Sequence, residues 1–237
     1  MVKDLIASYN HIFKLDPNRE ISDEQIKLIC QSGTDAIIVG GTLGITYNNT
    51  IRLLREIRKS SVAVIQEITN INSIVPGFDY YFIPLVINAQ NPNWIINVHQ
   101  QAIKRYGDII NWDQVFVEGY IILNEDSSAA RLTESKTNLM LEDVLAYATV
   151  IDQMLKLPIL YIEYSGVYGN VKWLRDIKYS VNNARVFYGG GIDSVEKAKE
   201  ASEYADTIVV GNVIYENFNL ALKTVLFKNQ LVGNKNF

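Results

Sequence analysis

Short runs of apolar, β-branched residues alternate with amphipathic segments along the whole chain. Runs such as AIIVG, YIILN and TIVVG are continuously apolar, which is typical of parallel strands covered on both faces. The pattern predicts eight strands: His11–Asp16, Thr34–Gly41, Val62–Ile68, Tyr80–Asn88, Glu118–Asn124, Pro158–Gly166, Ala184–Gly191 and Thr207–Gly211.

The segments between these strands have the spacing of helices. Seven helices are predicted: Ser22–Ser32, Asn48–Lys59, Pro92–Tyr106, Glu142–Leu155, Val171–Tyr179, Ser194–Tyr204 and Phe218–Phe227. Eight repeats of a strand and a crossing segment favour a closed (β/α)8 TIM barrel over an open doubly wound sheet. The 237 residues have the length of one such domain, spanning residues 1–237.

Two predicted loops are longer than the others, Asn70–Asp79 and Asn124–Leu139. The second is polar and rich in small residues. It is either a mobile cover for a site or a surface excursion.

Composition and net charge limit the classes of ligand that the chain can bind. A net charge of −4 argues against nucleic acid, whose binding needs a basic face. An anionic ligand must therefore be held by local groups. The single cysteine, Cys30, excludes an intrachain disulfide and is expected to be buried in a helix. No apolar run approaches about 18 residues, so we expect a cytoplasmic protein without stable membrane insertion.

Glycines and polar residues gather where three predicted strands end. The segments are Tyr161–Gly166, the triple glycine Gly189–Gly191, and Gly211 with Asn212. Glycine permits positive φ and close backbone approach, and the N-terminus of a following helix presents free N–H groups to an anion. In a (β/α)8 barrel the phosphate site lies after strands seven and eight. The sequence therefore predicts a phosphorylated ligand.

Strand alternation places further polar side chains at the same mouth. Lys14 and Asp16 share one face of their strand. Lys14 suits a phosphate and Asp16 suits magnesium, although the two could instead form an ion pair. Thr42 could bind metal or phosphate, or serve only as a turn residue. Glu67 is either a second inward carboxylate or the partner of a lysine or arginine.

Glu163 is the best candidate for a general base. It interrupts an otherwise apolar strand, and a buried carboxylate is costly unless it has a partner or a role. Tyr161 and Ser165 share its face. No Ser-His-Asp set can be assembled, and His11 and His99 lie in contexts that do not suggest a metal pair.

The chain resembles the PcrB-type heptaprenylglyceryl phosphate synthases and, more distantly, the archaeal geranylgeranylglyceryl phosphate synthases. The matching segments follow the same order along nearly the whole chain: FKLDP, SGTDAIIVGGT, VPGFDYYFIPLVIN, EGYIILN, YIEYSG, FYGGGI and ADTIVVGNVIYE. The resemblance implies a magnesium-dependent TIM-barrel prenyltransferase, usually a homodimer. Such enzymes join a polyprenyl diphosphate to the C3 hydroxyl of sn-glycerol 1-phosphate.

The resemblance also implies roles for particular residues. Asp16 and Thr42 would hold magnesium, and Glu163 with Tyr161 would be catalytic. A small residue at Ala102 would fit a long tail. Candidates to line its groove are Phe78, Tyr80, Tyr120 and residues of the predicted helix Pro92–Tyr106. Glycerol phosphate would contact Lys14, Tyr161, Ile162, Glu163, Tyr164, Ser165, Gly166, Gly191, Gly211 and Asn212.

Two other functions stay open at the level of the sequence. Many phosphate-binding barrels are isomerases or lyases acting on sugar phosphates or indole-glycerol phosphate, and the fold does not separate them. A barrel that binds phosphate or lipid without turnover is the non-enzymatic alternative.

Overall fold

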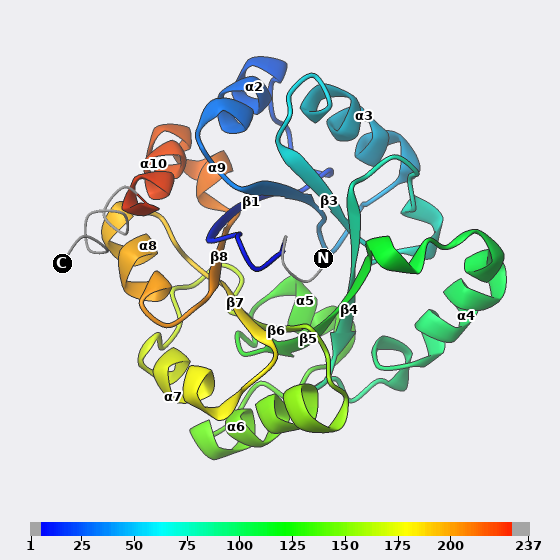
Figure 1. Cartoon of the computed structure of the whole chain (residues 1–237), viewed down its shortest axis with the longest axis vertical. Helices are drawn as coiled ribbons and strands as arrows, with labels where there is room; N and C mark the ends of the chain where they lie inside the picture. Colours follow the sequence, from blue (N-terminus) through cyan, green and yellow to red (C-terminus); the bar gives the residue numbers. More distant parts are fainter. Residues whose placement is uncertain (1–5, 229–237) are drawn as a thin grey trace.

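Eight parallel strands close into a barrel in the computed structural model, which describes residues 6–228 (Figure 1). Each strand pairs with its neighbours in sequence, and β8 returns to β1 with Val210 opposite Phe13. The predicted (β/α)8 barrel is confirmed, while residues 1–5 and 229–237 of the predicted domain lie outside the described part. The strands are β1 His11–Leu15, β2 Ala36–Val39, β3 Ala63–Glu67, β4 Tyr80–Val86, β5 Val115–Ile122, β6 Ile159–Glu163, β7 Arg185–Gly189 and β8 Thr207–Val210.

A ring of helices surrounds the strands in Figure 1. All seven predicted helical segments contain an α-helix: α2 Asp23–Gln31, α3 Tyr47–Ile57, α4 Asn97–Tyr106, α6 Leu141–Thr149, α7 Lys172–Ser180, α8 Val195–Ser202 and α10 Phe218–Lys223. Three of them are less regular than predicted. A separate 3₁₀ turn, Pro92–Trp94, precedes α4, a π-helix, Val150–Met154, continues α6, and a 3₁₀ turn, Thr224–Leu226, follows α10.

Two hydrophobic layers reflect the alternation of side chains along the strands. On β1, Ile12 packs inside the barrel, whereas Phe13 and Leu15 pack outside against the helices. By the same alternation Lys14 and Asp16 face inward. Both layers are fully buried at their centres, so the barrel interior is a packed core that leaves room for polar chemistry only near its ends.

A buried histidine at the start of β1 points into the layer between the barrel and the helices. Both ring nitrogens of His11 lie 3.0 Å from threonine hydroxyls, those of Thr34 and Thr224. His11 is therefore structural, as is His99, whose Nε2 contacts the Pro84 carbonyl at 3.1 Å. Cys30 on α2 is half-buried, so its predicted full burial is wrong.

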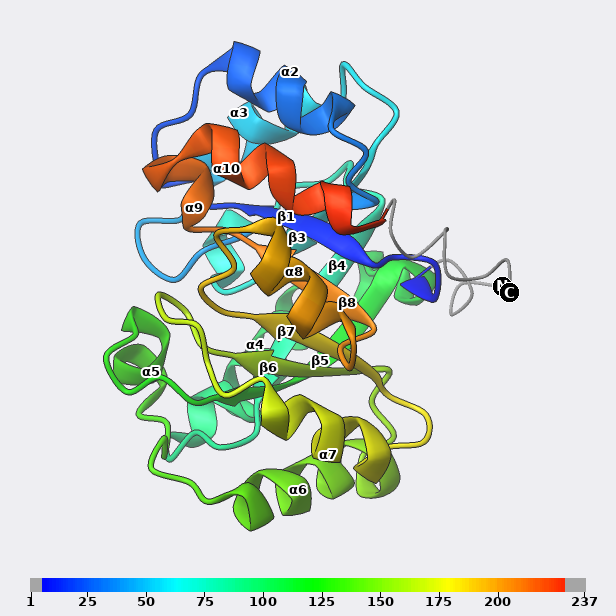
Figure 2. The same cartoon turned by 90° about the vertical axis from the view of Figure 1, so that its left-hand side faces the viewer.

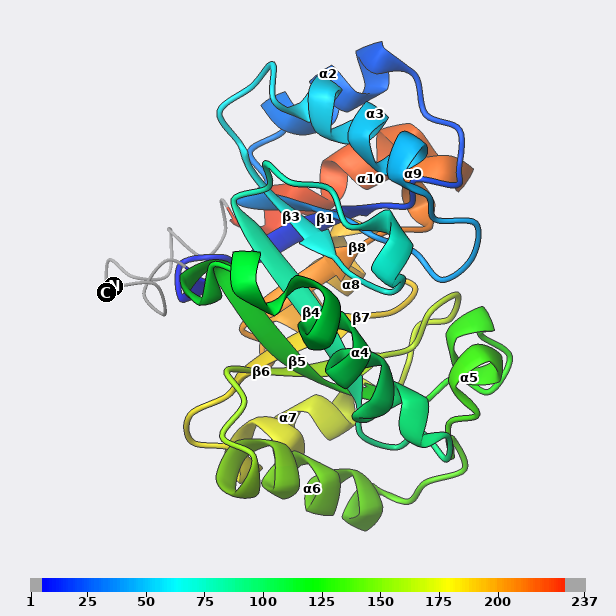
Figure 3. The ribbon, with the colours of Figure 1, turned by 90° about the vertical axis from the view of Figure 1, so that its right-hand side faces the viewer.

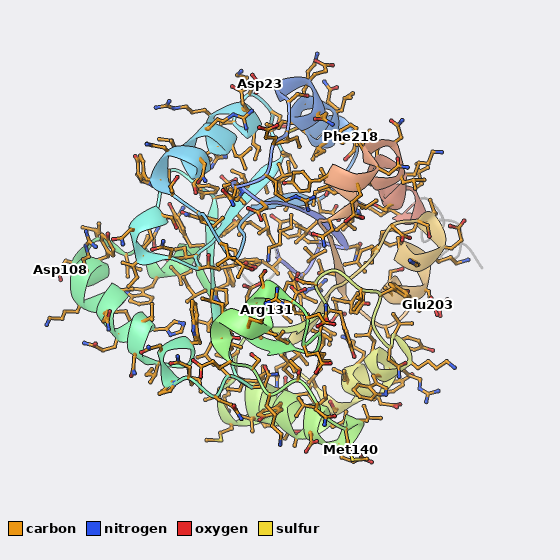
Figure 4. The ribbon with its side chains drawn as sticks, turned by 180° about the vertical axis from the view of Figure 1, so that it is seen from behind. Asp23, Asp108, Arg131, Met140, Glu203 and Phe218 are labelled. Carbon is orange, nitrogen blue, oxygen red and sulfur yellow. The ribbon has the colours of Figure 1, made fainter. Side chains whose placement is uncertain are left out.

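The carboxyl ends of the strands carry two short helices that the sequence pattern did not reveal. Helix α5, Ser128–Thr133, follows β5 within the long loop, and α9, Val213–Glu216, follows β8. Both lie at the same end of the barrel, on the left of Figure 2 and the right of Figure 3. In Figure 4, α5 with Arg131 lies in front of the strands. None of the helices within residues 6–228 has the length and apolarity needed to cross a bilayer.

Candidate active site

An ion pair between β1 and β3 lies inside the barrel near its carboxyl end. Lys14 Nζ donates to both carboxylate oxygens of Glu67, at 2.7 and 2.8 Å. The ammonium also lies 5.9 Å from the ring of Tyr120 and 5.8 Å from that of Tyr161. Glu67 therefore pairs with a lysine, which was one of the two roles predicted for it. Lys14 forms its ion pair with Glu67 and not with Asp16, the other partner that the sequence offered.

Glu163 ends β6 beside this pair and is 5% exposed. Its Oε1 accepts a hydrogen bond from Ser165 Oγ at 2.5 Å, and its Oε2 accepts one from Tyr120 Oη at 3.0 Å. Burial raises the pKa of the Glu163 carboxyl, although Lys14 and the Ser165 hydroxyl oppose that effect. A carboxylate with a raised pKa is better matched to accept a proton near neutral pH.

Two tyrosines form the wall next to Glu163. The rings of Tyr120 and Tyr161 are stacked, with centroids 4.2 Å apart and an interplanar angle of 12°. Burial raises the pKa of both phenols well above the ordinary value, so both stay protonated. The two phenols are therefore hydrogen-bond donors at the mouth.

The triple glycine makes room for side chains of the neighbouring strand. A Cβ at Gly189 would lie 2.4 Å from Tyr161 Oη, and one at Gly190 would lie 2.5 Å from the Cβ of Tyr164. Only Gly191 has a left-handed backbone, with φ +53°. Packing thus explains the first two glycines, and the third provides the turn expected at a phosphate site.

Three strand ends, those of β5, β6 and β8, meet around Gly166, whose φ is +88°. A Cβ there would lie 3.9 Å from Asn124 Nδ2 and 4.0 Å from Asn212 Nδ2. Gly211 faces β1, since a Cβ on it would lie 3.6 Å from the Lys14 carbonyl oxygen. The glycines predicted to bind phosphate therefore share one mouth with Lys14.

Two residues predicted to contact glycerol phosphate turn their side chains away from this mouth. Ile162 is 1% exposed in the layer between barrel and helices, and Tyr164 packs against the same layer. Only the backbone of these two residues can face a ligand at the mouth.

The predicted magnesium residues are Asp16 and Thr42, both half-buried. A Cβ at Gly41, next to Thr42, would lie 2.6 Å from the carboxylate carbon of Asp16, so this glycine leaves the space that the carboxylate occupies. Residues 6–228 contain no cluster of three or more His, Cys, Asp or Glu side chains that could hold a metal. One carboxylate and one hydroxyl fit magnesium, which keeps several waters and takes other oxygens from substrate phosphates.

Besides Glu67 and Glu163, the barrel interior holds a buried carboxylate that the sequence did not predict. Glu118 on β5 is fully buried, and neither of its carboxylate oxygens has a hydrogen-bond partner within the described residues. Burial and the nearby Glu67 carboxylate raise its pKa well above the usual range. The only signal in the sequence was its place two residues before Tyr120, on the same inward face.

The suggested tail-lining residues divide three ways. Tyr120 belongs to the polar network around Glu163, as its hydrogen bond at 3.0 Å shows. Phe78 is 3% exposed and packs in the layer between the barrel and the helices. Tyr80 begins β4, far from the carboxyl ends of the strands. The predictions that Phe78 and Tyr80 line a groove at the mouth are wrong for this structure.

The fold and this mouth define a (β/α)8 barrel whose strand ends bring glycines, a lysine and buried carboxylates together. Sequence comparison gives the family: residues 4–229 match the PcrB family, and the chain belongs to it. Heptaprenylglyceryl phosphate synthase of Bacillus cytotoxicus is 51% identical over 220 residues, which cover 93% of this chain and 96% of the relative. The protein of the same name from Anoxybacillus flavithermus is 52% identical over 220 residues, covering 93% and 95%.

A solved structure has the same fold. It is (S)-3-O-geranylgeranylglyceryl phosphate synthase of Thermoplasma acidophilum in complex with its substrate sn-glycerol-1-phosphate. The TM-score is 0.81 at 20% identity, with 94% of each chain covered. At that identity the likeness supports the barrel and no residue roles.

Proposed function

We propose that this protein is a prenyltransferase that joins a long polyprenyl diphosphate, by its relatives' name a heptaprenyl one, to the C3 hydroxyl of sn-glycerol 1-phosphate. The products are an ether-linked prenylglyceryl phosphate and diphosphate. The observation that carries the proposal is the position of Glu163: a buried carboxylate close to Lys14, at the mouth where Gly166, Gly211 and Asn212 lie. Membership of the PcrB family supports the same reaction.

Each part of the site has a chemical task. Lys14, Gly191, Gly211 and Asn212 hold the phosphate of the glycerol substrate and aim its free hydroxyl at Glu163. As the carbon–oxygen bond to diphosphate breaks, the hydroxyl oxygen bonds to C1 of the allylic chain and its proton passes to the Glu163 carboxylate. Tyr120 and Ser165 hold that carboxylate in place.

Magnesium is the cofactor we propose, held by Asp16 and Thr42 together with oxygens of the diphosphate. When bound, it would neutralise the charge that builds up on the departing diphosphate. Gly41 supports this assignment, because any larger residue there would place its Cβ within 2.6 Å of the Asp16 carboxylate.

The poorly covered helix α4 supports a path for the prenyl tail. It buries none of its residues fully, and Ile96 and Ile103 are 60% and 49% exposed, with Ala102 half-buried between them. An exposed apolar surface of this kind marks contact with an apolar ligand or partner.

Product mass tests the proposal directly. The protein is incubated with magnesium, sn-glycerol 1-phosphate and polyprenyl diphosphates of several lengths, and the ether product is identified by mass spectrometry. We expect turnover with the longer chains, none after chelation, and a large loss in Glu163→Gln. Turnover of an aldose phosphate without metal would instead favour an isomerase. Binding of glycerol phosphate without any product would favour a non-catalytic barrel.

The oligomeric state and location are further proposals. A cytoplasmic homodimer, with at most peripheral membrane contact, rests on the family resemblance alone. Light scattering of the purified protein measures the mass in solution, and a monomer would contradict the dimer.

A further inference from the structure

Arg19 lies between the turn after β1 and the segment after β8, and among residues 6–228 its guanidinium forms no ion pair with a carboxylate. Its guanidinium carbon is 4.0 Å from the centre of the Tyr215 ring, and its Nη1 lies 3.4 Å from Asn212 Oδ1. Within residues 6–228 no salt bridge joins Arg19 to an acidic residue, whereas Lys14 is paired with Glu67. In a chain with a net charge of −4, Arg19 is thus a positive charge at the site that no direct ion pair neutralises among the described residues.

The side chain is held in place from two strand ends. The Arg19 N–H donates to the Asp16 carbonyl at 3.0 Å, which closes a turn after β1. The Asp16 N–H donates to Tyr215 Oη at 2.8 Å, so the ring that stacks on Arg19 is tied to the same turn. A stacked guanidinium is already oriented, and it loses less freedom when it binds an anion.

Asn212 separates Arg19 from the glycines Gly166 and Gly211, where we propose that glycerol phosphate binds. The Nδ2 end of its amide faces Gly166, where an added Cβ would lie 4.0 Å away, while the Oδ1 end faces Arg19. Arg19 is therefore on the side of Asn212 that holds Asp16. Its Coulombic influence reaches that carboxyl, where it opposes the rise in pKa that burial causes.

Space is available beside the guanidinium. An open pocket of about 710 Å³ lies between the turn after β1, the start of helix α2 and helix α3. Its lining includes two cations, Arg19 and Arg52, and one carboxylate, Glu20. Arg52 is the second cation of this pocket, but it is occupied by the Ile21 carbonyl at 2.8 Å and the Asp23 carboxylate at 3.1 Å. Of these two arginines, only Arg52 forms a salt bridge within the described residues, and the guanidinium of Arg19 stays available for a ligand.

We propose that Arg19 is a substrate-binding residue that holds the diphosphate of the prenyl donor, next to the Asp16 metal position and apart from the glycerol phosphate. The guanidinium fork matches two phosphate oxygens. It would bind the diphosphate before the reaction and retain it as the leaving group. This inference rests on the proposed prenyl transfer and names the residue that distinguishes its two phosphorylated substrates.

The test uses Arg19→Gln and Arg19→Lys, with Arg52→Gln as a control from the same pocket. For each protein the KM values of prenyl diphosphate and of sn-glycerol 1-phosphate are measured separately. Calorimetry with inorganic pyrophosphate and magnesium gives a binding constant that does not depend on turnover. Thermal midpoints report whether each variant is folded.

We expect Arg19→Gln to weaken pyrophosphate binding roughly tenfold to a hundredfold, the effect of losing charge-assisted hydrogen bonds. The KM of prenyl diphosphate should rise in parallel, and that of glycerol phosphate should stay within about twofold. Arg19→Lys should retain part of the affinity because it keeps the charge without the fork. Arg52→Gln should change neither constant by more than about twofold, since its guanidinium is already engaged.

Two results would overturn the inference. One is an equal or larger rise in the KM of glycerol phosphate, which would assign Arg19 to that substrate. The other is pyrophosphate binding unchanged in both Arg19 variants. If Arg19→Gln unfolds, Arg19→Lys decides by the same criteria. A wild-type protein that binds pyrophosphate through Arg19 but forms no prenyl ether would refute the proposed function and leave the assignment of Arg19 standing.

Discussion

Replacing Gly41 by alanine should disable the Asp16 carboxylate and leave the barrel intact. The new Cβ would lie 2.6 Å from both Cγ and Oδ1 of Asp16. Carbon atoms in ordinary contact are about 3.5–4.0 Å apart, so the carboxylate must retreat by roughly 1 Å. Asp16 is only half-buried and has room to turn. The strain is thus relieved by moving the side chain, and stability should change little.

The expected loss of activity follows from that displacement. A shift of about 1 Å in a positioned group costs roughly 100-fold in rate, equivalent to about 2.7 kcal/mol in the barrier. We therefore predict that kcat/KM falls about 100-fold for Gly41→Ala, with a higher magnesium concentration needed for half-maximal rate. Gly107→Ala is the matched control, because its new Cβ would meet only Ile103 Cγ2 at 3.5 Å.

A double-mutant cycle sharpens the result. If Gly41→Ala acts by moving Asp16, adding Asp16→Asn should cost less than about threefold further, because the two changes disable one group. Losses that multiply would show that Gly41 acts through something other than Asp16. A Gly41→Ala protein with kcat/KM within threefold of wild type would refute the steric argument itself.

Three further predictions concern buried titratable groups. Glu163→Gln should lower kcat by about 10²–10⁴ without unfolding the protein, as rate measurements and thermal midpoints can check. Burial lowers the pKa of His11 from 6.5 to about 3, so the folded state excludes a proton that the unfolded chain binds. The contribution of His11 to the free energy of unfolding is complete above pH 6.5 and is lost towards pH 3, at about 1.4 kcal/mol per pH unit. A denaturant titration in which the stability of His11→Gln has the same pH slope as wild type would contradict this. The raised pKa of Glu118 has the opposite effect on stability. Above pH 4.5, the ordinary pKa of a glutamate, the folded state must hold a proton that the unfolded chain releases. Wild type should therefore lose stability relative to Glu118→Gln as pH rises from 5 to 8, and a constant difference would refute a neutral Glu118.

The strands were predictable because their burial leaves a simple signal. A parallel strand covered on both faces is continuously apolar, and a polar residue inside such a run stands out, as Glu163 does. The period of two then placed Lys14 and Asp16 on one face of their strand, and the packing of Ile12 inside and Phe13 outside shows that this face is the inward one.

The short helices were not predictable for an equally simple reason. Helix α9 has four residues and α5 has six, too few to show the repeat of a helical face. Both occur where the chain must turn at the carboxyl end of a strand. The α5 segment has the composition of a polar loop, and the apolar α9 segment is too short to show a helical repeat, so the sequence pattern alone left the mouth without its covering elements.

Contacts between distant strands were also beyond the reach of the sequence. Tyr120 was considered only for the prenyl tail, yet it bonds Glu163 because β5 and β6 pair in a register that places Tyr120 opposite Tyr161. Lys14 found its partner 53 residues away on β3. Residue type restricts which groups can pair, but only the closed barrel selects among them.

The triple glycine shows how packing and ligand binding can produce the same sequence motif. Gly189 and Gly190 are required because Tyr161 of β6 and Tyr164 just after it occupy the volume of any Cβ. Gly191 is required both by its left-handed backbone and by the backbone of Val167 and Tyr168, which lies where its Cβ would be. The first glycine is nevertheless functional, since it admits the Tyr161 ring that stacks on Tyr120, the donor to Glu163. A glycine-rich strand end in this barrel therefore has two structural roles: Gly191 allows a left-handed turn, and Gly189 makes space for the side chains that hold the Glu163 carboxylate.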